Sequence, residues 1–242
     1  MTRRLGGAKL WGALILVAAL ISGAAIALGN RHGPAPLPAR ADADKPTLLL
    51  VTSLPLVFAE NFQLAGGSPT LTALERRYRV EPIAVTDLAG LGKGRLLLMA
   101  HPLAQPAEAL VDLDRWVRGG GRLVLLADPR LDWPSERPLG DSLRPPPAFA
   151  DTGLLKHWRL TLYAPETAGP VDRRVDGRAV RLSSPGILAG ACGLRRDGLL
   201  ARCEIGRGRA TIIADADFLR SDSADSDSLQ FLLAELARVE PN

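Results

Sequence analysis

Three side chains of the kind used by serine hydrolases, Ser53, His101 and Asp128, each follow a short apolar run of the sequence. Such triads depend on geometry and not on chain order, so a serine nucleophile, a histidine base and an orienting aspartate can come from distant segments. Ser53, however, lacks the G-x-S-x-G turn that exposes the nucleophile of α/β hydrolases. The sequence favours a structural interpretation, in which Asp128 fixes the proline-rich loop after it and His101 shapes a turn before the next proline.

The acidic run DADFLRSDSADSDS, residues 215–228, is a second candidate, since clustered carboxylates suit hard metal cations. The run lacks the central glycine and terminal glutamate of an EF-hand loop. Within this run, Asp215 and Asp217 are the one local pair whose carboxylates could lie on the same side at the end of a strand. For the later residues, Asp225 to Asp227, we favour a place at the N-terminus of the last helix, where negative charge is stabilising. No metal site and no cofactor are therefore expected.

A cysteine nucleophile is the third possibility, because the stretch GACG around Cys192 superficially resembles the elbow of a glutamine amidotransferase. Leu194 occupies the place of the elbow's second glycine. Such an enzyme also needs a histidine base after the cysteine, whereas all three histidines precede it: His32, His101 and His157. The missing base excludes this chemistry.

Cys192 and Cys203, the two cysteines of the chain, flank Asp197-Gly198, a strong signal for a hairpin turn. If Arg196 pairs with Leu199 across that turn, Cys192 faces Cys203 on the same side of the ladder. Counting from the turn makes them a hydrogen-bonded pair, with Cα atoms about 5.5 Å apart, which a disulfide can span. Zinc is disfavoured because no further ligands lie nearby. We predict a disulfide that joins the two strands of a hairpin.

Apolar runs alternate with amphipathic segments along most of the chain. Four runs are typical of strands buried on both faces: 47–53, 95–100, 122–128 and 209–215. Three segments show helical spacing and helix-end signals: 68–78, 106–121 and 226–239. The stretch 79–85, with Pro82, suits an edge strand. This order predicts an α/β fold, a mostly parallel sheet flanked by helices of the flavodoxin or amidotransferase-like kind, with a β-rich hairpin insertion in 171–204.

Ligands of such a sheet gather at the carboxyl ends of its strands. The candidate ligand-facing residues all lie at predicted strand ends: Ser53, His101, Asp128, Asp215 and Asp217. The proline-rich stretch 129–149, which comes after one of these strands, is too long for an ordinary connection. We predict that it is a mobile loop.

The N-terminal part of the chain has a different composition. Residues 10–29 carry no charge and are about as long as a helix needs to cross a bilayer. The positive residues in 1–9 predict a cytoplasmic N-terminus and export of the rest of the chain. The prolines and alanines of 30–46 predict a spacer, and 47–242 an exported domain. In a bacterial cell the domain would lie in the periplasm on a single-pass inner-membrane anchor; a cleaved signal peptide is the alternative.

The stretch AHPLAQPAEALVDLDRWVRGGGRLVLLADP, residues 100–129, resembles the exported domain of GldG-like proteins, auxiliary subunits of gliding-motility-type ABC transporters. Three further pieces come next in the family's order: GLLKHW at 153–158, GRAVRLSSPGIL at 177–188 and GRGRATIIADADFL at 206–219. The resemblance covers most of residues 47–240. It implies a fold similar to class I glutamine amidotransferases without their catalytic apparatus, and ABC permease and ATPase subunits as partners.

The sequence thus predicts a membrane-anchored periplasmic accessory domain that binds a partner and is not an enzyme. Two alternatives stay open: an envelope hydrolase that uses Ser53, His101 and Asp128, and a glycan-binding module. Nucleic acid is not expected as a partner. The 242 residues carry a formal net charge of +4, and their arginines are scattered along the chain and do not form runs.

Overall fold

A computed structural model describes residues 34–57, 67–195 and 197–241 of the chain. The chain divides into two compact units, Met1–Ala35 and Pro36–Asn242, and the second contains every element named below. The predicted anchor, 10–29, and the predicted cytoplasmic segment, 1–9, lie outside the described residues. Within the described ranges, no helix has the length and apolar character needed to span a bilayer.

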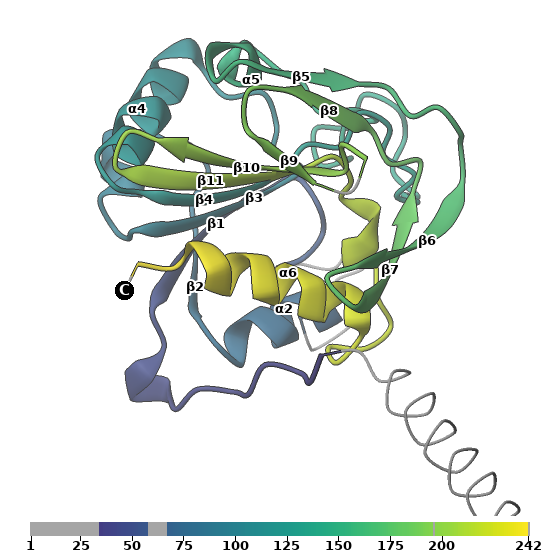
Figure 1. Cartoon of the computed structure of the whole chain (residues 1–242), viewed down its shortest axis with the longest axis horizontal. Helices are drawn as coiled ribbons and strands as arrows, with labels where there is room; N and C mark the ends of the chain where they lie inside the picture. The colour runs from purple at the N-terminus through teal and green to yellow at the C-terminus, as the bar shows by residue number, and fades with distance from the viewer. Residues whose placement is uncertain (1–33, 58–66, 196, 242) are drawn as a thin grey trace, which may run out of the picture. The chain divides into compact units, whose positions relative to one another are not determined.

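A seven-stranded sheet forms the centre of the second unit, in the order β2-β1-β3-β4-β11-β10-β9 (Figure 1). Five neighbouring strands are parallel: β2 (Arg79–Pro82), β1 (Thr47–Thr52), β3 (Leu96–Ala100), β4 (Arg122–Leu126) and β11 (Gly208–Ile213). Two antiparallel strands complete it: β10 (Leu200–Ile205) and β9 (Gly193–Arg195). The predicted α/β fold with a mainly parallel sheet is confirmed, and the strand that contains Pro82 lies at the edge, as predicted.

Helices cover both faces of the sheet, and capping residues in the sequence set their ends. On one face lie α2 (Pro69–Glu75) and α6 (Asp227–Val239), which appear below the sheet in Figure 1. On the other lie α4 (Ala107–Arg118), α5 (Leu154–His157) and α3 (Leu88–Leu91). Ser68 and Ser226 cap α2 and α6, since each hydroxyl accepts the N–H three residues later.

Alternate residues of the strands supply two separate cores. Leu98 and Val124 point to the α6 face and pack with Leu232 and Leu236 among others. Their neighbours in β3 and β4 point to the α4 face and pack with Leu113 and other residues of α4. Because both faces are covered, every residue of β3 is buried, which explains why the apolar runs are continuous in the sequence.

Two smaller antiparallel pairs supply only part of the β-rich insertion predicted in 171–204, because the hairpin of β9 and β10, which falls in the same range, belongs to the seven-stranded sheet. One joins β5 (Leu160–Tyr163) to β8 (Ile187–Gly190), and the other joins β6 (Pro170–Val175) to β7 (Arg178–Ser183). The β6–β7 hairpin turns at Asp176-Gly177, where both residues have positive φ. Strand β7 lies beside α6 in Figure 1 and contacts it.

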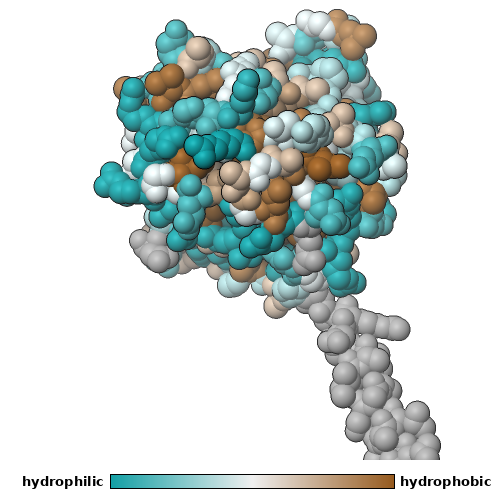
Figure 2. All heavy atoms as spheres, turned by 45° about the horizontal axis from the view of Figure 1, so that its top comes forward, coloured by the Kyte–Doolittle hydropathy of each residue, from teal (hydrophilic) through white to brown (hydrophobic). Residues whose placement is uncertain are grey.

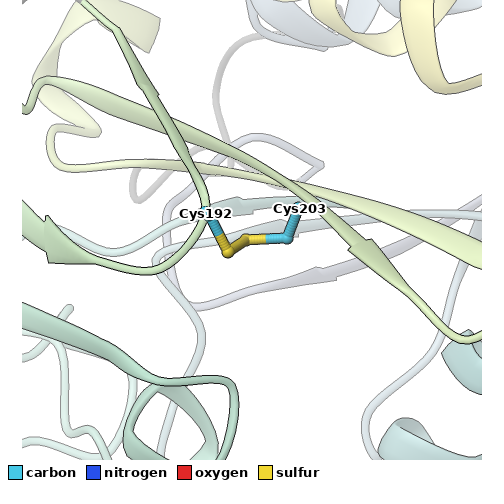
Figure 3. The surroundings of a disulfide bond; sticks show 2 residues. All are labelled: Cys192 and Cys203. Carbon is cyan, nitrogen blue, oxygen red and sulfur yellow. A yellow bond between two sulfur atoms is a disulfide. The ribbon is translucent and has the colours of Figure 1, made fainter.

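The β9–β10 hairpin has the predicted register. Arg195 pairs with Leu200 and Gly193 with Arg202, so Cys192 comes opposite Cys203, and the two form a disulfide (Figure 3). Asp197 and Gly198 have φ values of 55° and 82°, as the turn requires. The Cα atoms are 4.9 Å apart, shorter than the expected spacing of about 5.5 Å. Cys192 lies one residue outside β9, where the described ladder has ended, so ladder spacing does not apply to it.

Part of the predicted spacer packs on the domain. The N–H of Leu37 donates to Oε1 of Gln230 in α6 at 2.9 Å. Arg40 forms an ion pair of 2.7 Å with Glu240 and lies over the ring of Tyr78. A short 3-10 helix, η1 (Asp42–Asp44), then leads into β1. From Pro36 onward this segment therefore belongs to the folded unit.

Candidate functional site

The carboxyl ends of four neighbouring strands lie side by side along one edge of the sheet. Ser53 comes directly after β1, His101 directly after β3, and Asp128 and Asp215 lie two residues beyond the ends of β4 and β11. The hydrogen bonds of these residues divide them into two groups. Ser53 contacts His101, whereas Asp128 and Asp215 belong to a cluster of carboxyl groups.

Ser53 and His101 contact each other through the backbone. The Ser53 hydroxyl donates to the main-chain oxygen of His101 at 2.5 Å. The imidazole Nε2 lies 2.9 Å from the carbonyl oxygen of Pro146, which can only accept, so Nε2 carries the proton. Nδ1 is buried without a hydrogen-bond partner. Burial lowers the pKa of His101, although the Pro146 carbonyl opposes this shift, so the ring is neutral at pH 7.

Asp128 holds the start of the loop 129–149. It is fully buried. Its Oδ1 accepts the N–H of Arg130 at 2.9 Å, and its Oδ2 accepts the N–H of Ala216 at 2.8 Å. The N–H of Phe149 donates to the main-chain oxygen of Asp128 at 2.6 Å, which brings the two ends of the loop together. No hydrogen bond within the described ranges joins this carboxyl to the ring of His101.

The loop 129–149, predicted to be mobile, has defined contacts in the structure. The N–H of Leu131 donates to the oxygen of Pro147 at 2.9 Å. Leu131 and Trp133 pack against the core on the α6 face. The N–H of Asp132 donates to Oδ2 of Asp217 at 2.8 Å. The loop therefore brings a further carboxyl group to the strand ends.

Four aspartates form a group that we call the carboxyl cluster: Asp128, Asp132, Asp215 and Asp217. Asp215 accepts the N–H of Ser183 at 2.9 Å and that of Phe218 at 3.2 Å. Asp132 accepts the hydroxyls of Ser183 and Ser184 at 2.8 and 2.5 Å. Asp217 keeps Oδ1 buried and unpaired. The cluster thus ties β11, the loop 129–149 and the end of β7 together.

Burial and mutual repulsion change the acidity of the cluster. Burial, assisted by Asp217 and Asp132, raises the pKa of Asp128 to about 7. Burial and then the charge of Asp128 raise the pKa of Asp215 well above its usual range. Burial also raises the pKa of Asp217 to about 6. For Asp132, burial is outweighed by the hydroxyls of Ser184 and Ser183, and the pKa is lowered. Asp132 is therefore the member of the cluster that ionises at the lowest pH.

The described residues contain no group of side chains with the arrangement of a metal site. Asp215 and Asp217, the pair with metal-site potential in the sequence, each bond to backbone N–H groups. The acidic residues farther along have other contacts. Asp225 pairs with Arg76 at 2.5 Å, and Asp227 stands in the first turn of α6. Ser226 and Asp227 thus stand at the start of the last helix, whereas Asp225 pairs with the residue that ends α2.

A cavity of about 550 Å³ lies beside the carboxyl cluster. It lies between β7 and the segment that leads into α6, and polar residues form much of its lining: Ser183, Asp217, Arg181, Arg220 and Ser228. Its size is typical of a small-ligand site. Sequence reasoning did not single out Asp132, Ser183 and Ser184. Asp132 lies in the proline-rich loop, and the two serines lie in the segment 177–188, which was quoted above only for its resemblance.

Asp217→Asn is expected to increase the free energy of unfolding by about 2 kcal/mol at pH 8 and much less at pH 4. The folded-state pKa, about 6, lies above the usual 3.8. The stability linked to the protonated carboxyl is therefore fully present below the usual pKa and is lost as pH rises through about 6. Asparagine removes this loss and can still accept the N–H of Asp132. Urea denaturation at both pH values measures the effect.

The matched control for this experiment is Asp222→Asn, which changes an exposed aspartate of the same acidic run. It should leave the stability at both pH values nearly unchanged. An equal gain from Asp217→Asn at pH 4 and pH 8 would contradict the assignment of a raised pKa to this residue.

Comparison with known proteins finds no matching family model and no matching curated protein. Among solved structures, the cytoplasmic protein STM3548 from Salmonella typhimurium matches with a TM-score of 0.50 and 10% identity, over 81% of this chain and all of that one. The mmIFT52 N-terminal domain matches with a TM-score of 0.49 and 12% identity, over 81% of this chain and all of that one.

A β-galactosidase from Bacillus circulans sp. alkalophilus is also similar, with a TM-score of 0.45 and 14% identity. It aligns with 84% of this chain, which spans only 32% of the galactosidase. At these identities a likeness carries information on fold alone, because unrelated functions share folds. The chain has a class I glutamine amidotransferase-like α/β fold.

Proposed function

We propose that this chain is a non-catalytic accessory domain, anchored by residues 10–29 to the outer face of the inner membrane, that works with the permease and ATPase of an ABC-type transport system. One observation carries the non-catalytic part. The polar side chains at the strand ends, where a ligand would react in this fold, hold backbone groups in place and do not face one another as acid, base and nucleophile.

A hydrolase would need the Ser53 hydroxyl to donate to an imidazole nitrogen and an aspartate to orient that imidazole. Here the hydroxyl donates to a main-chain oxygen, the imidazole to Pro146, and both Asp128 oxygens accept backbone N–H groups. Each group is bound to a partner that catalysis would have to displace. This pattern supports binding and not bond cleavage.

The cavity beside the carboxyl cluster is the place where we expect the domain to contact its partner. It combines cationic, anionic and hydroxyl side chains in one hollow, which suits a polar peptide segment or a glycan more than an apolar ligand. The disulfide agrees with a location in an oxidising compartment. We propose a transporter as the partner because residues 100–129 and three later segments resemble GldG-like proteins.

Affinity purification of the full-length chain, cross-linked in intact cells and extracted in mild detergent, tests the proposal. We expect permease and ATPase subunits of one transport system to be enriched together. A variant with Arg181→Glu and Arg220→Glu, which reverses two charges of the cavity, should lose them, because the partner's complementary charges would then be repelled. Arg174→Glu, an exposed position on β6 outside the cavity, is the matched control.

Recovery of the chain without any transporter subunit would contradict the transporter assignment. Ester or amide hydrolysis by the full chain that disappears in Ser53→Ala would contradict the non-catalytic assignment and favour the envelope hydrolase. Enrichment on isolated peptidoglycan, lost with the two charge reversals, would replace the protein partner by a glycan.

A further inference from the structure

Four arginines surround a cavity of about 390 Å³ at the amino ends of the parallel strands, whereas the carboxyl cluster lies at their carboxyl ends. We call this the arginine pocket and define it by Arg95, Arg122, Arg207 and Arg209. Glycines at the end of α4 and the C-terminal Glu240 and Pro241 complete its wall. Cavities of this size accept small molecules.

The parallel sheet brings these arginines together. Arg95 and Arg122 precede or begin β3 and β4, and the N–H of Arg122 donates to the Arg95 oxygen at 2.9 Å. Arg209 is the direct register partner of Arg122 in β11. Between Arg207 and Arg209 stands Gly208, where a Cβ would lie 1.9 Å from the Val117 oxygen. Only glycine allows this close approach of β11 to the end of α4.

The positive charge of the pocket is not neutralised by its surroundings. In the described part of the chain, none of the four arginines forms an ion pair, whereas many other arginines do, among them Arg40, Arg76 and Arg202. The carboxylate in the wall, Glu240, already binds Arg40 and the hydroxyl of Tyr78. Glu204 is the register partner of Arg209 but forms no described ion pair with it.

Arg122, at the centre, carries the clearest sign of a missing ligand. Its Nε is buried without a hydrogen-bond partner, and one Nη contacts the main-chain oxygen of Arg207 only at 3.4 Å. Burial, followed by the charges of Arg209 and Arg95, lowers the pKa of Arg122. An unpaired buried donor and mutual repulsion are both unfavourable, and an anion would relieve both.

The nearby end of α4 does not compete with such an anion. Its last carbonyl groups would repel negative charge if they were free. They accept N–H groups instead: those of Gly119, Gly120 and Gly121 bond to Arg115, Val117 and Trp116. The oxygen of Arg118 accepts the N–H of Arg207 at 3.0 Å. The negative end of the helix is thus engaged by backbone groups.

We propose that the arginine pocket is a binding site for a phosphate group, supplied either by a soluble phosphate ester or by a lipid headgroup. Guanidinium groups bind phosphate through paired hydrogen bonds, and several of them match its multiple negative charges. The site is separate from the cavity beside the carboxyl cluster. The proposal of a phosphate site does not depend on the function proposed above.

Isothermal titration of the full chain in a neutral detergent at low salt, with inorganic pyrophosphate as the probe, tests the proposal. We expect saturable binding at one site. Arg122→Gln should weaken it about tenfold or more, because one charge-assisted hydrogen-bond donor is lost. Arg207→Gln, at an exposed position that should not disturb folding, is expected to weaken it similarly.

The matched control is Arg174→Gln, which removes the same charge from an exposed position on β6, where the side chain contacts the oxygen of Gly177. It should bind pyrophosphate as the unmodified chain does. Absence of saturable binding, or equal affinity in Arg207→Gln and Arg174→Gln, would overturn the proposal. The second result would mean that only net charge attracts the anion.

Nanodiscs distinguish the two sources of the phosphate. If phosphatidylglycerol discs suppress pyrophosphate binding and phosphatidylcholine discs do not, and Arg207→Gln abolishes the difference, the site takes an anionic headgroup. Equal pyrophosphate binding in both kinds of disc assigns a soluble phosphate ester. Either outcome supports a phosphate site.

Discussion

Asp215→Ala is expected to lower the free energy of unfolding by about 3 kcal/mol. The carboxyl group is fully buried and accepts the N–H groups of Ser183 and Phe218. Alanine would leave both donors unpaired and would also leave a cavity. Removal of a group whose pKa is raised well above its usual range gives some relief, but less than the cost of two unpaired donors. Urea denaturation at pH 7 measures the loss.

Asp222→Ala provides the comparison for this substitution, since Asp222 is an exposed residue of the same acidic run. It should change the free energy of unfolding by less than about 0.5 kcal/mol. If Asp215→Ala proved as stable as Asp222→Ala, the carboxyl cluster would have no structural role, and a functional role for Asp215 would become the better explanation.

Replacing both cysteines by serine should lower the free energy of unfolding by about 3 kcal/mol. The Cys192–Cys203 bond joins residues 11 positions apart, and a cross-link over such a loop restricts the unfolded chain by about that amount. It also holds β9, a strand of three residues at the edge of the sheet. Thermal and urea denaturation of the variant Cys192→Ser/Cys203→Ser, under non-reducing conditions, measure the effect.

Reduction offers the control for the disulfide. The unmodified chain treated with dithiothreitol should approach the stability of the double serine variant, while the variant itself should not respond. Mass spectrometry of unreduced peptides should find the two cysteines linked. Two free thiols in the protein isolated from the cell envelope, or equal stability of the oxidised chain and the variant, would contradict a structural disulfide.

The exposed hydrophobic residues do not mark a binding surface. Figure 2 shows hydrophobic residues on one face of the molecule, separated from each other by hydrophilic ones. The exposed large hydrophobic side chains come from many elements, such as Leu88 in α3, Val111 in α4 and Tyr163 in β5. Single exposed residues of this kind are normal in soluble domains. The polar cavity and the arginine pocket are therefore the better candidates for recognition.

Local patterns were sufficient to predict the framework of the fold. A strand covered on both faces needs apolar residues throughout, so the run that became β3 could be recognised without knowledge of its neighbours. A serine before a proline predicted the start of α2, because the hydroxyl can satisfy a free N–H there. Asp197-Gly198 determined the register of a hairpin and thereby the partner of each cysteine.

The candidate residues could be placed at the strand ends from sequence, but their hydrogen bonds could not. Whether Asp128 faces His101 or Ala216 depends on the path of the long loop 129–149, and loops are held by contacts that local patterns do not encode. The loop itself supplied Asp132, which completes the carboxyl cluster. The amino-acid sequence alone therefore does not distinguish a catalytic triad from a set of buried structural carboxylates.

The arginine pocket also could not be predicted from local patterns, although the sequence contains a signal for it. A Gly-Arg pair stands at the start of three of the apolar runs, at Arg95, Arg122 and Arg209, and the starts of parallel strands share one edge. Strands, helix ends and one disulfide could be predicted from local patterns, because each depends on hydrophobic spacing or turn geometry over a few residues. Which charges meet could not be predicted in this way, because strand order and long-range packing bring together side chains that are far apart in the chain.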